Sequence, residues 1–127
     1  MSRAYRIVCY LEVDAALTQE DYTFWQDILF RCIDEPTDVL EGQEDYVSLP
    51  DHVDVYPIQD SKTQFRYDTE MNLCGVCSQE DYAEDFRRAL HLLTQNVTLD
   101  FKVSLYLYYL EHDPDLSVEY DRQELAA

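Results

Sequence analysis

Two segments of the chain alternate between apolar side chains and a second set of residues, as strands with one buried face do. The first segment, residues 5–13, carries on one face Tyr5, Ile7, Cys9, Leu11 and Val13. The second segment, residues 101–109, carries on one face Phe101, Val103, Leu105, Leu107 and Tyr109. We therefore expect one strand near the N-terminus and one long strand late in the chain.

Apolar residues recur every three or four positions in residues 18–34 and 78–95, as they do on the buried face of a helix. In the first helix this face comprises Tyr22, Trp25, Ile28, Leu29, Cys32 and Ile33. In the second helix it comprises Tyr82, Phe86, Ala89, Leu90 and Leu93. Phe24 and Phe30 lie outside the first face, so we expect both rings to be exposed.

Two weaker patterns predict further strands. Val53 and Val55 together with residues 64–70 predict a hairpin whose turn lies at residues 59–62. Residues 116–121 are expected to return antiparallel to the long late strand. The economical assembly is an α+β fold, in which two helices pack on one face of a mainly antiparallel sheet. A ferredoxin-like arrangement is one version of this fold.

The chain repeats itself weakly. The segment TQEDY at residues 18–22 recurs as SQEDY at residues 78–82, and each copy opens a predicted helix. One interpretation is that residues 1–60 and 61–122 are two β-α-β-like halves of a single domain spanning residues 1–127. The alternative is that both copies are only good helix starts, because Ser and Thr are N-cap residues and acids favour a helix N-terminus.

The charge of the chain restricts its partners. Of 127 residues, 27 are Asp or Glu and 9 are Lys or Arg, which gives a formal net charge of −18. Direct binding to DNA, RNA or an anionic membrane requires a basic face, so the charge excludes these ligands. No apolar run approaches the roughly 20 residues of a membrane span. Four cysteines without an evident signal peptide favour free thiols in a reducing cytoplasm.

Cysteine spacing is the sharpest candidate for chemistry. Cys74 and Cys77 have the spacing of a redox pair or of half a zinc site, but zinc needs two more ligands. Cys9 and Cys32 are expected on apolar faces, so no metal site is predicted, and zinc or thiol chemistry at Cys74 and Cys77 is kept as an alternative. Two glycines cannot form a phosphate-binding loop, and Ser and His show no nucleophile spacing. We therefore predict neither an enzyme nor a cofactor.

Acidic residues are concentrated in residues 34–60. Their charge is uncompensated within this segment, because no basic residue occurs between Arg31 and Lys62. The first part of this segment, residues 34–45, contains proline and glycine and is expected to form a loop. Acids also recur two positions apart at Glu12/Asp14, Asp68/Glu70, Asp113/Asp115 and Glu119/Asp121. In a strand such a pair shares one face at roughly 6.5–7 Å, which resembles the spacing of phosphates along a nucleic acid.

These features suggest a small inhibitor that mimics the charge of nucleic acid and blocks a basic DNA- or RNA-binding protein. A phage protein that acts in the host cytoplasm against a CRISPR effector or a restriction enzyme fits this hypothesis. An immunity protein or antitoxin that neutralises a basic nuclease toxin is the runner-up, because it uses the same physics. A solvated surface that only keeps the protein soluble is the alternative without a partner.

The predicted contact surface combines acids with aromatic residues, which are enriched at protein interfaces. Tyr106 and Tyr108 lie on the opposite face of the late strand from its apolar set. The alternatives for these rings are a second buried layer or a homodimer contact. The predicted contact residues are Asp34, Glu35, Asp38, Glu41, Glu44, Asp45, Asp51, Asp54, Glu111, Asp113, Asp115, Glu119, Asp121, Phe24, Phe30, Tyr106 and Tyr108.

The net charge makes a first prediction about nucleic acid itself. Because the field around the protein is negative nearly everywhere, the isolated protein should not retard duplex DNA or RNA in a gel, even at low salt. A clear mobility shift at about 50 mM salt would contradict the argument from charge.

Overall fold

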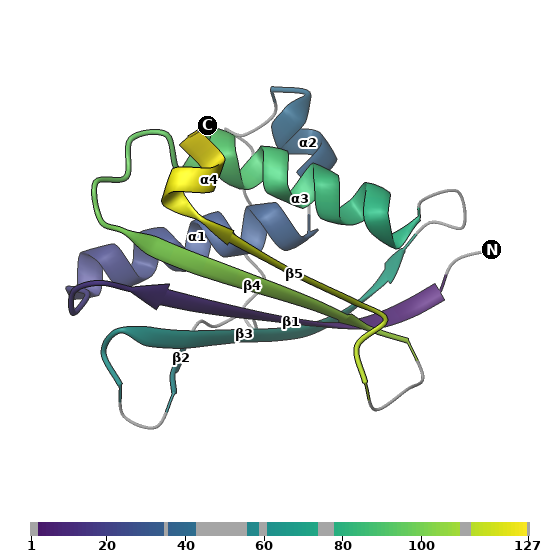
Figure 1. Ribbon diagram of the computed structural model, residues 1–127, viewed down its shortest axis with the longest axis horizontal. Helices are drawn as coiled ribbons and strands as arrows, with labels where there is room; N and C mark the ends of the chain where they lie inside the picture. The colour runs from purple at the N-terminus through teal and green to yellow at the C-terminus, as the bar shows by residue number, and fades with distance from the viewer. Residues whose placement is uncertain are drawn as a thin grey trace.

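Five strands form one sheet, and the helices lie on one side of it (Figure 1). The computed structural model describes residues 3–34, 36–42, 56–58, 61–73, 78–109 and 113–126. The strands are β1 (Arg3–Val13), β2 (Tyr56–Pro57), β3 (Gln64–Leu73), β4 (Phe101–Tyr108) and β5 (Leu116–Asp121). The helices are α1 (Gln19–Asp34), α2 (Pro36–Leu40), α3 (Gln79–Leu93) and α4 (Arg122–Ala126). In these ranges no helix has the length and apolarity that a membrane span requires.

The strand order is β2-β3-β1-β4-β5. Strand β1 lies at the centre and runs antiparallel to both of its neighbours, β3 and β4. Helix α3 therefore connects two strands that are parallel to each other and have β1 between them. The predicted α+β class, an antiparallel sheet with helices on one face, is confirmed. The elements follow one another as β1-α1-α2-β2-β3-α3-β4-β5, and the ferredoxin-like version is not confirmed.

The predicted hairpin is present where β2 pairs antiparallel with the start of β3. Its turn is closed by Ser61, whose Oγ accepts hydrogen bonds from the backbone N–H groups of Thr63 and Gln64, both at 3.1 Å. Val53 and Val55, which also belong to the predicted hairpin, lie outside the described residues.

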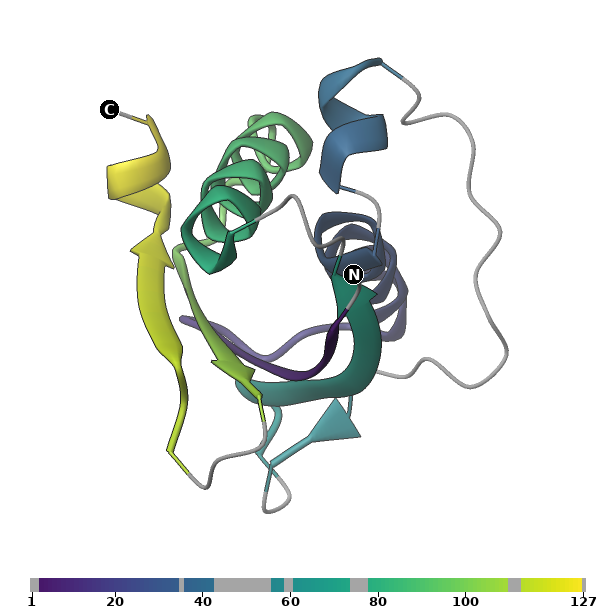
Figure 2. The ribbon, with the colours of Figure 1, turned by 90° about the vertical axis from the view of Figure 1, so that its right-hand side faces the viewer.

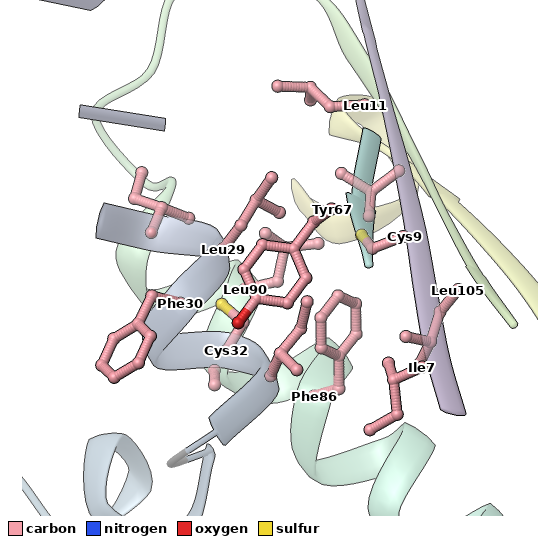
Figure 3. Packing of buried hydrophobic residues seen from close by; sticks show 14 of the residues in the cluster. Ile7, Cys9, Leu11, Leu29, Phe30, Cys32, Tyr67, Phe86, Leu90 and Leu105 are labelled. Carbon is pink, nitrogen blue, oxygen red and sulfur yellow. The ribbon is translucent and has the colours of Figure 1, made fainter. Parts of the chain in front are cut away.

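The inner face of the sheet and the facing sides of α1 and α3 form one hydrophobic core. Figure 3 shows Cys9 and Leu11 of β1 on one side of the Tyr67 ring and Leu29 and Cys32 of α1 on the other. The largest fully buried side chains are Trp25, Tyr67, Phe86, Ile7, Leu11, Leu29, Ile33, Leu90, Leu105, Leu107 and Val103. Each contributes about 1.5–3 kcal/mol when removed from water, so burial of these faces is the main stabilising term.

Helix α2 corrects the prediction that residues 34–45 form a loop. Pro36 is its first residue, where a missing N–H costs nothing because that group has no partner inside the helix. Gly42 follows the helix with φ 85°, a conformation that glycine adopts without strain. Helix α2 packs against α1 and α3, and its Val39 belongs to the core.

This packing also corrects the prediction that Phe30 is exposed. Only 4% of Phe30 is accessible. Figure 3 shows its ring on the far side of α1 from Ile7 and Leu11 of the sheet. The periodicity of α1 marks only the stripe that faces the sheet, whereas α1 also packs against α2, which the sequence pattern did not predict.

Both predicted N-caps are present. The Thr18 Oγ1 accepts a hydrogen bond from the backbone N–H of Asp21 at 3.2 Å and donates one to the Asp21 carboxylate at 2.9 Å. The Ser78 Oγ accepts a hydrogen bond from the backbone N–H of Asp81 at 3.0 Å. The N–H of the third helical residue therefore binds both cap hydroxyls. At α1 the Asp21 carboxylate also accepts a hydrogen bond from the Thr18 N–H at 3.3 Å, as in a capping box with Asp in place of Glu.

Removal of either cap should destabilise the protein. We expect Thr18→Ala and Ser78→Ala each to lower the free energy of unfolding by roughly 0.5–2 kcal/mol, because one N-terminal N–H loses its partner. Thr23→Ala is the matched control, since Thr23 lies one turn into α1 and bonds only to the Gln19 carbonyl. Urea denaturation followed by tryptophan fluorescence measures all three variants. Equal losses in Thr23→Ala and Thr18→Ala would show that the cap is not the stabilising element.

Candidate functional site

The predicted contact residues do not form one site. Asp34, Asp38 and Glu41 lie at the end of α1 and on or just after α2, whereas Asp113 and Asp115 precede β5. Glu119, Asp121, Tyr106 and Tyr108 lie on β4 and β5, with their side chains on the face of the sheet that has no helices. The remaining acids lie outside the described residues; they are Glu35, Glu44, Asp45, Asp51, Asp54 and Glu111.

Asp34, Asp38 and Glu41 lie close to acids of α3 that the sequence analysis did not include among the contact residues. Helix α2 packs against α3, and the Tyr82 hydroxyl of α3 donates a 2.5 Å hydrogen bond to the Ile33 carbonyl of α1. The first turns of α3 and the end of α1 therefore lie side by side (Figure 2). We call the combined set the acidic helical surface; it comprises Asp34, Asp38, Glu41, Glu80, Asp81, Glu84 and Asp85.

This surface is only weakly compensated by basic residues. Helices α1, α2 and α3 contain nine Asp or Glu and three Arg in their sequences. Arg31 is used by Asp27 at 3.4 Å, and Arg87 is used by Glu84 at 2.6 Å. The hydrogen bonds from Arg87 lower the pKa of the Glu84 carboxyl. Among the described residues, Asp38, Glu41, Glu80, Asp81 and Asp85 form no ion pair with Arg31, Arg87 or Arg88.

Asp34 is placed against a local rule of helix electrostatics. It ends α1, where the macrodipole is negative and a cation is the favourable residue. Its charge also contributes to raising the pKa of the neighbouring Tyr67 and Tyr82 hydroxyls, after burial.

The helix-free face of the sheet, which we call the open face, carries a different arrangement. Both carboxylate oxygens of Asp68 on β3 are bound by arginines: Arg6 of β1 donates at 3.2 and 2.7 Å, and Arg66 donates at 2.7 Å. These charge-assisted hydrogen bonds, the Arg6 bond first, lower the pKa of Asp68 and raise the pKa of Arg6. The open face therefore has two guanidinium groups around one carboxylate.

Tyrosine rings extend this array. The Arg6 guanidinium lies 5.9 Å from the centre of the Tyr108 ring, and Arg66 lies 5.7 Å from the Tyr10 ring, within the range of cation–π contacts. Tyr10 and Tyr106 meet edge to face at 5.8 Å. Val8 is only 3% exposed although no helix covers it, and it lies outside the main core. The open face is thus an ordered second cluster.

The open face corrects the expectation that the strand acids form uncompensated rows. Its acids are Glu12, Asp68, Glu70, Glu119 and Asp121, and its bases are Arg6, Arg66 and Lys102, as the alternation of the strands assigns them. Lys102 lies 3.7 Å from Glu119. Asp68/Glu70 and Glu119/Asp121 do share a face, but basic residues from neighbouring strands, distant in sequence, accompany them. The other two predicted pairs do not lie on strands, because Asp14 follows β1 and Asp113/Asp115 precede β5.

Two further acids have structural duties. The Asp115 carboxylate accepts a 2.6 Å hydrogen bond from the Tyr109 N–H and closes the turn before β5. The Asp121 carboxylate accepts a 2.7 Å hydrogen bond from the Glu124 N–H and begins α4, a helix that the sequence pattern did not predict. These carboxylates stabilise the fold directly, so their presence does not by itself indicate a partner.

The predicted aromatic contacts also separate. Phe24 is 47% exposed and lies on α1, whereas Phe30 is buried and cannot be a surface anchor. Tyr106 and Tyr108 are half-buried on the open face. The exposed ring on the helical layer and the two tyrosines on the sheet therefore face different directions.

The thiol chemistry has no support among the described residues. Cys9 and Cys32 are free and buried, and burial raises the pKa of both thiols. Within the part of the chain that the structure describes, no group of three or more His, Cys, Asp or Glu side chains could hold a metal ion. Cys74 and Cys77 lie outside the described residues, so zinc or thiol chemistry at that pair stays an untested alternative.

Comparison of the chain with protein-family models, curated proteins and solved structures finds no match. The function must therefore be inferred from the two surfaces themselves. The acidic helical surface was missed in part because the acids at residues 80–85 were considered only as helix-start residues. Their signal in the sequence is a run of four acids in six positions that ends only at Arg87.

The pairing of Asp68 predicts a dependence of stability on pH. A carboxyl whose pKa is lower in the folded state stabilises the fold above the pKa of an unfolded Asp, near about 4, and loses this effect as pH falls through its folded pKa. Asp68→Asn should therefore lower the free energy of unfolding at pH 7 by about 1 kcal/mol, after solvent screening. Glu70→Gln, on the same strand and face, should cost less. Urea denaturation should give a constant difference between wild type and Asp68→Asn from pH 5 to 8 that shrinks below about pH 4. A difference that stays unchanged at low pH would exclude the ion pair as its origin.

Proposed function

We propose that the protein is an inhibitor that occupies the phosphate-binding surface of a basic DNA- or RNA-binding protein with its acidic helical surface. The observation that carries the proposal is the uneven distribution of charge. Helices α1 to α3 contain nine acids and three arginines, whereas the open face contains five acids and three basic residues. Charge that only maintained solubility would have no reason to collect on one layer.

The energetic cost of this arrangement supports a partner. Like charges crowded on one surface destabilise a compact fold, and Asp34 adds a negative charge at the wrong end of its helix. A cationic partner would convert this repulsion into attraction. Phe24, exposed beside the buried Trp25 with ring centres 6.2 Å apart, would add a short-range contact at the rim.

The kind of target follows from what the surface lacks. Phosphate contacts position a protein on nucleic acid, whereas base-edge contacts provide sequence specificity. The acidic helical surface offers carboxylates in place of phosphates and nothing that copies a base edge. The target class that we propose is a nuclease that holds nucleic acid mainly through its backbone, such as a CRISPR effector or a restriction enzyme. A basic nuclease toxin fits the same physics.

Neutralisation of the acidic helical surface tests the proposal. The variant combines Asp38→Asn, Glu80→Gln, Asp81→Asn and Asp85→Asn, which removes four charges and keeps side-chain size. The immobilised protein is exposed to bacterial lysate with EDTA, and bound proteins are released with duplex DNA at constant ionic strength. Wild type should release nucleic-acid-binding proteins into the DNA eluate. Affinity for such a protein, measured after its purification, should fall at least about tenfold in the variant, since close charge pairs contribute 1.5 kcal/mol or more.

A control variant that loses the same number of charges elsewhere on the surface shows whether the position of the acids or the net charge determines binding. It combines Asp14→Asn, Glu20→Gln, Asp113→Asn and Glu124→Gln, which lie away from the acidic helical surface and whose side chains form none of the ion pairs described above. This control should bind like wild type apart from a slower on-rate. The proposal is wrong if duplex DNA releases no nucleic-acid-binding protein, or if the two four-residue variants lose the same affinity.

A further inference from the structure

The register of the sheet places the outward side chains of the open face in rows that cross β3, β1, β4 and β5 in that order. One row is Gln64, Glu12, Lys102 and Asp121. The next row is Arg66, Tyr10, Ser104 and Glu119. The third row is Asp68, Val8, Tyr106 and Ser117. The fourth row begins Glu70, Arg6 and Tyr108.

When either of the first two rows is set against a copy of itself that runs in the opposite direction, from β5 to β3, residues of opposite charge face each other. A two-fold axis that runs along the strands between β1 and β4 keeps each row in place and exchanges its ends. Glu12 then faces Lys102 of the second copy, and Arg66 faces Glu119 of the second copy. From this geometry we infer that the open face binds the open face of a second copy of this chain, with β1 over β4 and β3 over β5 around this axis.

The contacts made at this interface differ along the axis. Glu12 with Lys102 and Arg66 with Glu119 are pairs of opposite charge, and each occurs twice because a two-fold contact repeats every pair. In the fourth row Arg6 faces the Tyr108 ring of the second copy, which repeats between copies the cation–π contact made within one chain at 5.9 Å. In the third row Tyr106 faces Val8.

The open face is hollowed where these pairs lie. A depression of about 440 Å³ is lined by Tyr10, Glu12, Gln64, Lys102 and Glu119 of the strands and is bordered by Ile58, which follows β2. Lys102 is 48% exposed and Glu119 is 59% exposed, so both side chains extend from the sheet. Each Lys102 therefore has room to reach Glu12 of the other copy, and the polar lining suits bridging water.

Charge selects the open face over the other surfaces. Two copies that each carry −18 repel one another, so association needs the face with the smallest excess of acid. The open face carries five acids with three bases, a smaller excess of acid than the nine acids with three arginines of α1 to α3, and it holds three of the nine basic residues of the chain. The other in-plane two-fold, perpendicular to the strands, would set Arg66 against Asp68, whose oxygens are already bound within their own chain. The axis along the strands leaves those bonds to Asp68 intact, and it exchanges the partners of the exposed Lys102–Glu119 pair, which are 3.7 Å apart within one chain.

The size of the face predicts a weak dimer. Four strands about 4.8 Å apart and four rows about 6.7 Å apart give a footprint on the order of 500 Å² per copy once side-chain breadth is included. The total of about 1,000 Å² is near the lower limit for a specific interface, where association is weak and transient. Salt should strengthen the dimer, because it screens the repulsion between the two acidic molecules.

The test uses variants that cannot pair with themselves but can pair with each other. Glu12→Lys sets lysine against Lys102 of the second copy, and Lys102→Glu sets glutamate against Glu12 of the second copy. Sedimentation velocity from about 5 to 200 µM, a range chosen for weak association, should show a wild-type dimer. Each variant alone should be a monomer, and their equimolar mixture should restore the dimer, because both cross-copy pairs then have opposite charge.

Matched controls change the same charge on the helical layer. Glu20→Lys matches Glu12→Lys, and Arg88→Glu matches Lys102→Glu, so both controls should dimerise like wild type. Thermal melts confirm that each variant is folded, which keeps a misfolded variant from imitating a broken interface. A wild-type monomer over the whole range, or a mixture that stays monomeric, would overturn the inference. Because the acidic helical surface lies on the other layer, loss of the dimer leaves binding to a basic protein intact, and the two proposals fail separately.

Discussion

Mutual repulsion of carboxylates is the constraint to which the rest of the structure responds. A chain with a formal charge of −18 folds only if burial of apolar surface outweighs that repulsion. One continuous core between the sheet and α1 and α3 supplies this burial, with side chains such as Trp25, Tyr67 and Phe86 almost completely removed from water. The positions of the few basic residues then determine where the negative charge is partly neutralised.

Those basic residues are not spread evenly. Arg6 and Arg66 share one carboxylate on the open face and stack beside tyrosine rings, which produces an ordered patch in which opposite charges alternate. The helices α1 to α3 carry the same number of basic residues, three, for nine acids instead of five, and carboxylates are concentrated where α1, α2 and α3 meet. The helical layer therefore has the larger excess of negative charge, and the two proposed contacts respond to salt in opposite directions.

Many acids in this protein also act as folding elements. Asp21 completes the cap of α1, Asp115 closes the turn before β5, and Asp121 begins α4. A carboxylate accepts these backbone N–H groups well because the interaction is assisted by charge. Acids with such duties must be separated from those that only face water before a binding surface is assigned. Glu80 and Asp85, which have no such hydrogen bond among the contacts described, belong to the second group.

The sequence by itself determined the long strands, the two long helices, their N-caps and the side of each element that is buried. Those features depend on contacts within one element, so periods of two and 3.6 residues and the residues at helix starts are sufficient. Only the tertiary structure decided that Phe30 is buried, that Asp68 lies between two arginines, and that the acids of α1 and α3 share a surface. Arg6 and Asp68 are 62 positions apart, and α2 packs on a side of α1 that no periodicity marks. Such pairings depend on strand order and register, which are set by how all the elements bury their apolar faces together.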